Sequence, residues 1–255
     1  MKQIQLKDFL DYRFLSNVRI SPDQKSCIFE VSTCDEESNS YHNNLYLWKD
    51  GKCTALTRSN KDSGAVYLDK DTVLFKSSRS AEIQERMEKG EEVTEFYKIS
   101  LKGGEAELFF DVPLMVSQIE VLDENTFLLL ASYNKDYSIA EREERKEELL
   151  QAKNKEKDYE VFTRIPFCYN GKGFMKNTIS RLYVYQVNEK ELKAVSPEEM
   201  NITSFQLKPD KSEVVVVADK VKKRVNMRSG IYTYHFASEL WKERVEENQF
   251  QIDSS

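Results

Sequence analysis

The stretches "LDKDTVLF" (residues 68–75) and "LDENTFLL" (residues 122–129) are near-copies of one pattern, a polar turn that leads into a strongly apolar strand. A second pair, "ISPDQKSCIF" (20–29) and "LKPDKSEVVV" (207–216), follows the same plan around turns that begin at Pro22 and Pro209. Proline presets φ for a tight turn, and aspartate hydrogen-bonds to its own backbone there. All four stretches therefore predict β-hairpins of one type.

A second hairpin follows each of these four. The second hairpins are "NNLYLWKDGKCTALT" (43–57), "EFYKISLKGGEAELFF" (95–110), "SRLYVYQVNEKELKAV" (180–195) and "SGIYTYHFASELWKERV" (229–245). Repeated four-stranded antiparallel units of about 40–50 residues are typical of a β-propeller, whereas jelly rolls and sandwiches lack this recurring order. We therefore predict an all-β chain with a helical extension at 1–17, followed by a partial β-propeller at 18–255. Its expected blades span about 18–60, 64–112, 116–197 and 202–247.

The number of units leaves two interpretations of the ring. The segment "QFQI" at 249–252 resembles the first strand of a fifth unit, which a closed ring of four blades would not need. Either the ring is small and carries a tail, or these four blades are part of a larger ring of seven or eight. We favour the larger ring. Its open edges would also allow self-association.

The third unit is longer than the others because of an insertion. Residues 139–160, "IAEREERKEELLQAKNKEKDYE", consist mainly of good helix formers and charged residues. The spacings of Glu141 to Arg145 and of Glu143 to Lys146 suit ion pairs on one helix face. Ile139, Leu149 and Leu150 are almost the only apolar anchors. We expect a solvated helix outside the sheets; the alternative is a helix that binds a partner.

Composition narrows the class of protein. The 255 residues include 38 Lys and Arg against 44 Asp and Glu, a net charge of -6, which argues against a general nucleic-acid binder. No apolar run has the length of a membrane span, and the first residues lack the apolar core of a signal peptide. The four cysteines form no CxxC motif, which favours free thiols in a reducing compartment. We therefore expect a cytoplasmic protein that binds neither membrane nor nucleic acid.

Two stretches, one on each side of the insertion, carry a family resemblance. "DYRFLSNVRISPDQKSCIFEVS" (11–32), the charged insertion and "RIPFCYNGKGF" (164–174) occur in that order. This order resembles the N-terminal propeller of the prolyl oligopeptidase family, in its acylaminoacyl-peptidase and dipeptidyl-aminopeptidase-like branch. The resemblance implies that a short N-terminal helix carries Arg13-Phe14 and that Gln24 takes the place of a glycine in a Ser-Pro-Asp-Gly turn. The matched positions after the insertion are Pro166, Phe167, Asn170, Gly171, Lys172, Gly173 and Phe174.

The resemblance also implies a function. In that family the propeller is a non-catalytic lid that admits short peptides to a C-terminal α/β-hydrolase domain, whose nucleophilic serine lies in a G-x-S-x-G turn. None of the eight glycines here flanks a serine at that spacing, so we expect no catalytic residue, metal or cofactor in this chain. The whole protein would be a serine peptidase that acts as an acylaminoacyl- or dipeptidyl-peptidase-like hydrolase. The alternative is a stand-alone propeller that serves as a scaffold or protein-binding module.

Several other residue groups suggest chemistry, but each has a simpler interpretation. Residues 164–174 lack the G-x-x-x-x-G-K-[ST] phosphate pattern, and Asn170-Gly171 favours a hairpin turn that returns the insertion to its blade. Cys168 stands between two aromatic residues, which suggests a packed thiol. His42 and His235 are far apart in the sequence, and the basic run 220–224 is expected to be a solvated loop. The family resemblance implies that a glutamate pair could hold the free amine of a peptide, and the pairs in this chain are Glu36-Glu37, Glu91-Glu92 and Glu143-Glu144.

Overall fold

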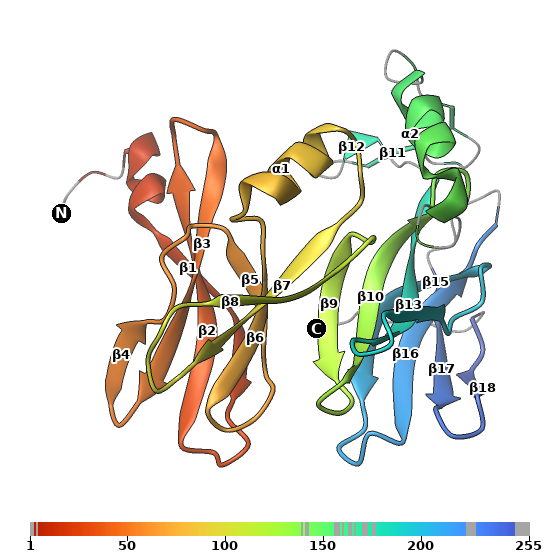
Figure 1. The fold of residues 1–255 in the computed structure, drawn as a ribbon. Coiled ribbons are helices and arrows are strands. Elements are labelled where there is room, and N and C mark those ends of the chain that lie inside the picture. The colour runs from red at the N-terminus through yellow and green to blue at the C-terminus, as the bar shows by residue number, and fades with distance from the viewer. Residues whose placement is uncertain are drawn as a thin grey trace. The chain divides into compact units, whose positions relative to one another are not determined.

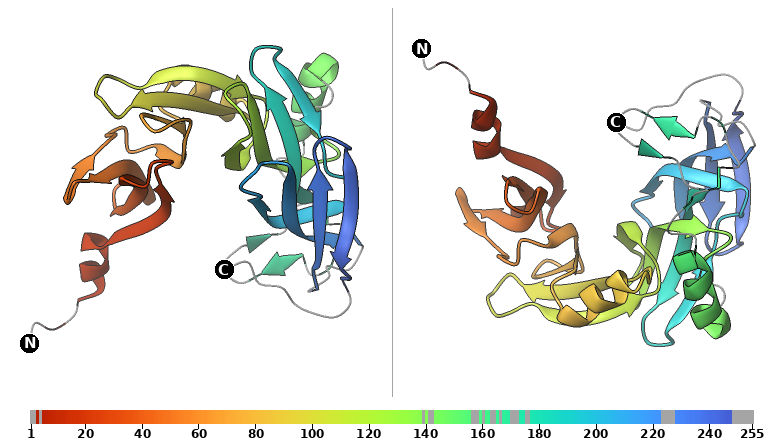
Figure 2. Two further views of the ribbon diagram at one scale, coloured as in Figure 1. Left: turned by 90° about the horizontal axis from the view of Figure 1, so that it is seen from below. Right: turned by 90° about the horizontal axis from the view of Figure 1, so that it is seen from above.

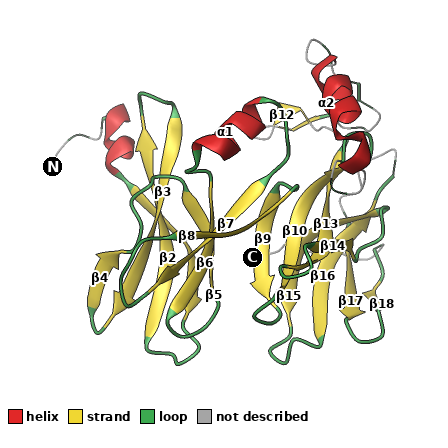
Figure 3. Cartoon of the chain, viewed as in Figure 1, coloured by secondary structure: helices red, strands yellow, loops and turns green. Residues whose placement is uncertain are grey.

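The computed structural model of the chain is built mainly from antiparallel β-sheets (Figures 1 and 3). The structure describes residues 3, 5–138, 140, 143–155, 159, 161–162, 165, 167–169, 173–174, 177–222 and 228–247. The chain divides into two compact units. The first comprises Met1–Lys89 and Val93–Val112, and the second comprises Gly90–Glu92 and Pro113–Ser255.

The first unit holds two four-stranded sheets, each with its strands in sequence order. The first sheet consists of β1 (Arg13–Ile20), β2 (Ser26–Asp35), β3 (Ser40–Lys49) and β4 (Lys52–Ala55). The second sheet consists of β5 (Asp62–Tyr67), β6 (Thr72–Ser77), β7 (Thr94–Ser100) and β8 (Glu107–Val112). Helix α1 (Ala81–Glu88) lies in the connection between β6 and β7, with the Ser80 side chain accepting a hydrogen bond from the Ile83 amide.

The second unit repeats this plan. The third sheet of the chain lies in this unit and consists of β9 (Val116–Val121), β10 (Thr126–Asn134), β13 (Thr178–Gln186) and β14 (Glu191–Ala194). The fourth sheet, also in this unit, consists of β15 (Met200–Leu207), β16 (Glu213–Lys220), β17 (Gly230–His235) and β18 (Leu240–Val245). The two views of Figure 2 show the four strands of each sheet running alongside one another. The prediction of an all-β chain made of four-stranded antiparallel propeller blades is confirmed.

Within each unit the two sheets share an apolar layer, which explains the alternation of buried residues along their strands. In the first unit this layer contains Ile28, Leu45, Val73, Phe75 and Ile99. In the second unit it contains Leu128, Leu182, Ile202, Val214 and Val216, among others. Burial of these side chains supplies the main driving force that holds neighbouring blades together.

The Pro-Asp turns have the predicted role of joining the first two strands of a sheet. Gln24 (φ 58°) and Lys211 (φ 58°) occupy equivalent positions in the two turns, in the left-handed region that favours glycine. The Asp23 carboxylate accepts a hydrogen bond from the Lys25 amide at 3.2 Å, and Asp210 accepts one from the Ser212 amide at 3.0 Å. These side-chain bonds stabilise turns whose left-handed position is occupied by a residue other than glycine.

The N-terminal helix is shorter than the expected extension at 1–17. Segment η1 (Leu6–Asp11) is a 3₁₀ helix, and strand β1 already begins at Arg13, which pairs with Thr33. Arg13 and Phe14 therefore lie on a strand and not on the helix, because pairing with β2 supplies the backbone hydrogen bonds of this segment. Segment 249–252, expected to begin a further blade, lies outside the described residues.

The insertion is helical over residues 143–155, as η2 (Glu143–Arg145) and α2 (Lys146–Lys155). Arg145 pairs with Glu148 at 2.7 Å, and Lys146 pairs with Glu91 at 2.8 Å. Glu141 and the side chain of Glu143 lie outside what the structure describes, so the two expected pairs stay predictions. In the described part of the chain, no helix is long and apolar enough to cross a membrane.

Candidate functional site

Two short paired strands are the part of the stretch 164–174 that the structure describes. Strand β11 (Cys168–Tyr169) pairs antiparallel with β12 (Gly173–Phe174), and the predicted turn at Asn170-Gly171 lies outside the described residues. The ring of Phe162 lies 5.4 Å from that of Phe167 and 5.5 Å from that of Phe174, measured between centroids. The predicted packed thiol is wrong, because the side chain of Cys168 is exposed.

The two histidines have separate local partners. The Nε2 atom of His42, on β3, lies 3.4 Å from the carboxylate of Asp35. The Nδ1 atom of His235, at the end of β17, lies 3.2 Å from the Ser238 hydroxyl. Among the described residues, no cluster of His, Cys, Asp and Glu could hold a metal ion.

One of the three glutamate pairs anchors the insertion. Glu91 binds Lys146 at 2.8 Å, and Lys153 lies 3.3 Å from Glu92 while donating a hydrogen bond to the Gly90 carbonyl at 3.0 Å. Glu36 instead pairs with Lys7 at the surface, and Glu144 is exposed. The pair Glu91-Glu92 therefore positions α2, and the helix is held more firmly than the solvated surface helix that we expected.

The basic run is also tied to the fourth sheet at its beginning. The amide of Lys220 donates to Glu247 at 2.9 Å, and the Lys222 ammonium pairs with the same carboxylate at 3.1 Å. Residues 223–227 lie outside the described residues. The described part of this run is thus a connection held by a buried glutamate.

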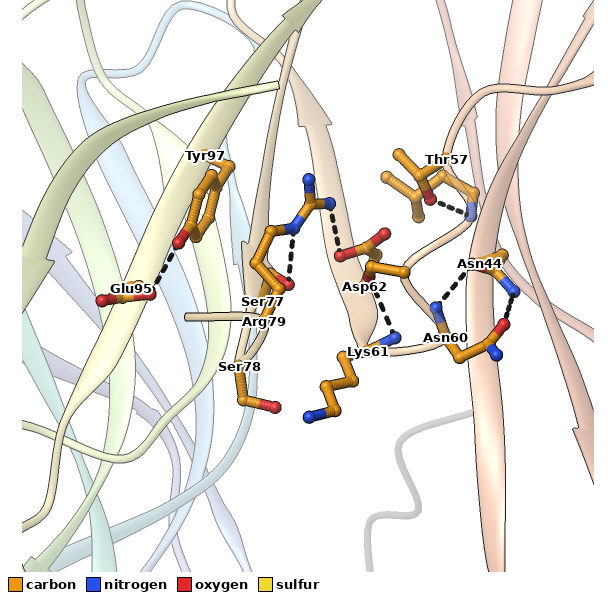
Figure 4. A network of polar contacts seen from close by, with 12 residues as sticks. Asn44, Thr57, Asn60, Lys61, Asp62, Ser77, Ser78, Arg79, Glu95 and Tyr97 are labelled. Carbon is orange, nitrogen blue, oxygen red and sulfur yellow. Dashed lines mark hydrogen bonds and ion pairs between the residues drawn. The ribbon is translucent and has the colours of Figure 1, made fainter. Parts of the chain in front are cut away.

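A buried polar cluster of the first unit lies on the second sheet, where the connection from the first sheet enters it, and we call Asp62, Ser77, Arg79, Glu95 and Tyr97 the Asp62–Arg79 network (Figure 4). Asp62 is fully buried at the start of β5, and its Oδ1 accepts a hydrogen bond from Arg79 Nη2 at 2.7 Å. Arg79 Nε donates to the Ser77 hydroxyl at 3.1 Å. Tyr97 donates to Glu95 at 2.8 Å. The guanidinium carbon also lies 4.9 Å from the centre of the Tyr97 ring.

Two groups of this network, Asp62 and Tyr97, have shifted pKa values. Burial disfavours the Asp62 carboxylate, but hydrogen bonding from Ser59, Arg79 and neighbouring hydroxyls outweighs that effect, so the pKa of Asp62 lies below its usual value. Burial and the adjacent Glu95 carboxylate raise the pKa of Tyr97 to about 12. Asp62 Oδ2 is buried without a direct hydrogen bond to any described residue. A carboxylate fixed as an anion beside an arginine suits a structural role and not proton transfer.

A similar arrangement occurs in the second unit. The guanidinium of Arg181, on β13, lies 4.5 Å from the centre of the Tyr133 ring and donates to the Ser196 carbonyl at 2.7 Å. Tyr133 in turn donates to Glu198 at 2.9 Å. In each unit an arginine thus stacks on a tyrosine of the same sheet, and Arg181 also binds the segment that leads from the third sheet to the fourth. Sequence reasoning missed these residues because no motif marks them; a charged residue at the start of an apolar strand, such as Asp62, is the only signal.

A second cluster lies where the first strands of the first two sheets carry β-bulges. Glu30 Oε1 accepts hydrogen bonds from the Gly64 amide at 2.5 Å and from Asn17 Nδ2 at 2.7 Å. Asn17 (φ 48°) and Gly64 (φ 63°) are the bulge residues of β1 and β5. Burial lowers the pKa of Lys76, although Glu30 opposes that shift. Bulges of this kind re-aim side chains on the first strand of a blade, the strand that lines the channel of a propeller.

These sheets define the chain as a β-propeller portion, and solved structures have the same fold. Acylaminoacyl peptidase from Pyrococcus horikoshii is 15% identical, with a TM-score of 0.61 over 94% of this chain and 33% of that chain. The tricorn protease is 14% identical, with a TM-score of 0.53 over 94% of this chain and 23% of that one. A puromycin-hydrolysing peptidase from Mycobacterium tuberculosis is 12% identical, with a TM-score of 0.51 over 93% of this chain and 30% of that one.

This likeness shows the fold and its extent. No protein-family model and no curated protein matches the sequence. The chain spans about a third of the length of the acylaminoacyl peptidases that it resembles. In these three peptidases the matching portion is a minor part of the chain.

Proposed function

We propose that this chain is the non-catalytic N-terminal propeller portion of a cytoplasmic serine peptidase of the prolyl oligopeptidase family. It would gate and position short peptides for an α/β-hydrolase domain that these residues do not include. The observation that carries the proposal is the match of 94% of the chain to a third of acylaminoacyl peptidase. The Asn-Gly-Lys-Gly stretch that follows the charged insertion supports the same assignment.

Gating would depend on the rigidity of the blades. Peptides would pass along the first strands, where the bulges at Asn17 and Gly64 shape the wall. The Asp62–Arg79 network would keep the second blade, and the connection that enters it through Thr57 and Ser59, in place while a peptide passes. Folded proteins would be excluded by size.

The proposal predicts that residues 1–255 alone do not hydrolyse peptides. Amide hydrolysis needs an activated nucleophile, a base and oxyanion donors, and loss of a whole triad costs several orders of magnitude in rate. The test uses purified chain with acylated and free-amine chromogenic peptides and a fluorophosphonate serine probe. Turnover together with stoichiometric labelling of one serine would contradict the proposal.

A stand-alone scaffold is the second candidate function. The coding sequence after Ser255 distinguishes the two. A strand-turn-helix pattern with G-x-S-x-G supports the peptidase, whereas a stop codon or unrelated repeats support the scaffold.

A further inference from the structure

A groove of about 530 Å³ separates the third and fourth sheets, both of which belong to the second unit. It lies at the end of these sheets where β13 joins β14 and where β17 joins β18. Its volume falls within the range of roughly 300–1,000 Å³ that is usual for ligand sites. The residues that line the groove include Asp123, Val184, Glu191, Lys193, Lys211, Tyr234, Phe236 and Glu239.

The floor of the groove is apolar and firmly packed. The Tyr234 ring lies 5.4 Å from the Phe236 ring and 5.1 Å from the Trp241 ring, measured between centroids. Trp241 Nε1 donates to the Val195 carbonyl at 2.9 Å, which joins the fourth sheet to the third beneath the groove. A floor that is already ordered loses little entropy when a ligand binds.

One polar group of the floor is available to a ligand. Tyr234 lines the groove and is only 4% exposed, and its hydroxyl makes no hydrogen bond with any residue that the structure describes. Burial, with the nearby carboxylate of Glu239, raises the pKa of Tyr234, so the hydroxyl keeps its proton and can donate. The hydroxyl oxygen is not enclosed by protein, so it can donate to a hydrogen-bond acceptor on a ligand in the groove.

The rim carries an excess of negative charge. Lys193 and Glu239 neutralise each other at 2.6 Å and connect the two sheets. Neither Glu191 nor Lys211 forms an ion pair with another described residue. Asp123 accepts hydrogen bonds from the backbone amides of Asn125 and Thr126. Outside the Lys193–Glu239 pair, the rim thus has the two carboxylates of Asp123 and Glu191 and only one ammonium, that of Lys211. This excess of negative charge favours a ligand with a positive charge beside its apolar part.

We propose that this groove is a peptide-binding site, which takes one bulky apolar side chain of an extended segment that is followed by a basic residue. The apolar side chain packs on Tyr234 and Phe236, and the Tyr234 hydroxyl donates to a peptide carbonyl. The basic side chain lies near Glu191. This site is independent of the proposed role in a peptidase, because it involves neither a hydrolase domain nor the first unit.

The test measures binding of a capped tetrapeptide, glycine-phenylalanine-lysine-glycine, to the whole chain by calorimetry and by ¹⁵N NMR. We expect saturable binding, with shifts concentrated on β14 and β17. Alanine in place of phenylalanine should abolish it. Tyr234→Phe removes only the hydroxyl and should weaken binding about threefold to tenfold. Glu191→Lys should weaken it by a similar factor and reduce the preference for lysine over glutamate in the peptide.

Matched controls separate the groove from general effects of each substitution. Tyr46→Phe on β3 and Glu107→Lys on β8 make the same chemical changes in the first unit and should leave binding unchanged. Circular dichroism would verify that each variant is folded. Absence of saturable binding at millimolar peptide would overturn the proposal. So would binding that tolerates both Tyr234→Phe and Glu191→Lys, or shifts that fall on other strands.

Discussion

The buried pair of Asp62 and Arg79 is the residue-scale feature with the clearest energetic consequence. Removing one partner of a buried pair leaves the other uncompensated. We expect Asp62→Ala to lower the free energy of unfolding by about 2–4 kcal/mol, since Arg79 keeps some exposure. Urea unfolding measures this change. Glu36→Ala, which breaks an exposed pair with Lys7, should cost less than about 1 kcal/mol. Equal losses in the two variants would contradict the structural role of the network.

The same carboxylate predicts a dependence of stability on pH. The pKa of Asp62 is lower in the folded chain than its usual value, so the unfolded state binds its proton first as the pH falls. The contribution is fully present above pH ~5 and is lost as the pH falls through the folded pKa, below ~4. Asp62→Asn should therefore flatten the acid side of a plot of unfolding free energy against pH. Some slope should remain, because the pKa values of Asp23, Asp35 and Asp71 are also lowered.

At the scale of elements, α2 is held by a few identifiable contacts. The side chain of Leu149 is only 5% exposed, and Lys146 and Lys153 contact residues 90–92. Lys153→Met should speed amide exchange in α2 while changing the free energy of unfolding by less than about 1 kcal/mol, because the pair is partly exposed. Arg145→Met, which breaks a pair within the insertion, is the matched control. Unchanged exchange in Lys153→Met would show that Lys153 does not help to anchor the helix and that Leu149 and Lys146 are sufficient.

The sequence predicts elements better than it predicts contacts between them. The turns at Pro22 and Pro209 and the helix in the insertion follow from local chemistry, so their patterns are visible in the chain. The network of Asp62 and Arg79, the anchoring of α2 by Glu91 and the groove floor at Tyr234 join residues that only folding brings together. Their residue types are ordinary for strands and loops, so no spacing reveals them.

At the scale of the whole molecule, the surface of the first sheet that faces away from the second sheet is unusually apolar. A row that runs across all four strands joins Ile20, Cys27, Trp48 and Cys53 by register. Leu15 is 66% exposed, Ile20 68% and Trp48 46%. The corresponding surface of the fourth sheet is more polar, since Leu240 is accompanied there by charged and hydroxyl side chains. Apolar surface of this extent favours association.

We therefore expect the isolated chain to self-associate through the first sheet in a concentration-dependent manner. Sedimentation velocity would show this, and replacing both Leu15 and Ile20 by serine should shift the chain toward monomer. Leu240→Ser on the fourth sheet should have little effect. A monodisperse monomer at all concentrations would contradict this expectation.

The insertion between β10 and β13 also governs how fast the third sheet can form. The pairing of Asp35 with Ser40 closes a short turn, whereas that of Asn134 with Thr178 must first bring together two distant segments. Loop-closure entropy makes the second step less favourable by about 2 kcal/mol, at about 0.6 kcal/mol for each doubling of loop length. The hairpins β9–β10 and β13–β14 can form early, but they must wait for each other with Leu128, Leu130 and Leu182 still in water. During synthesis the third sheet is thus the slowest to assemble and the one most exposed to aggregation.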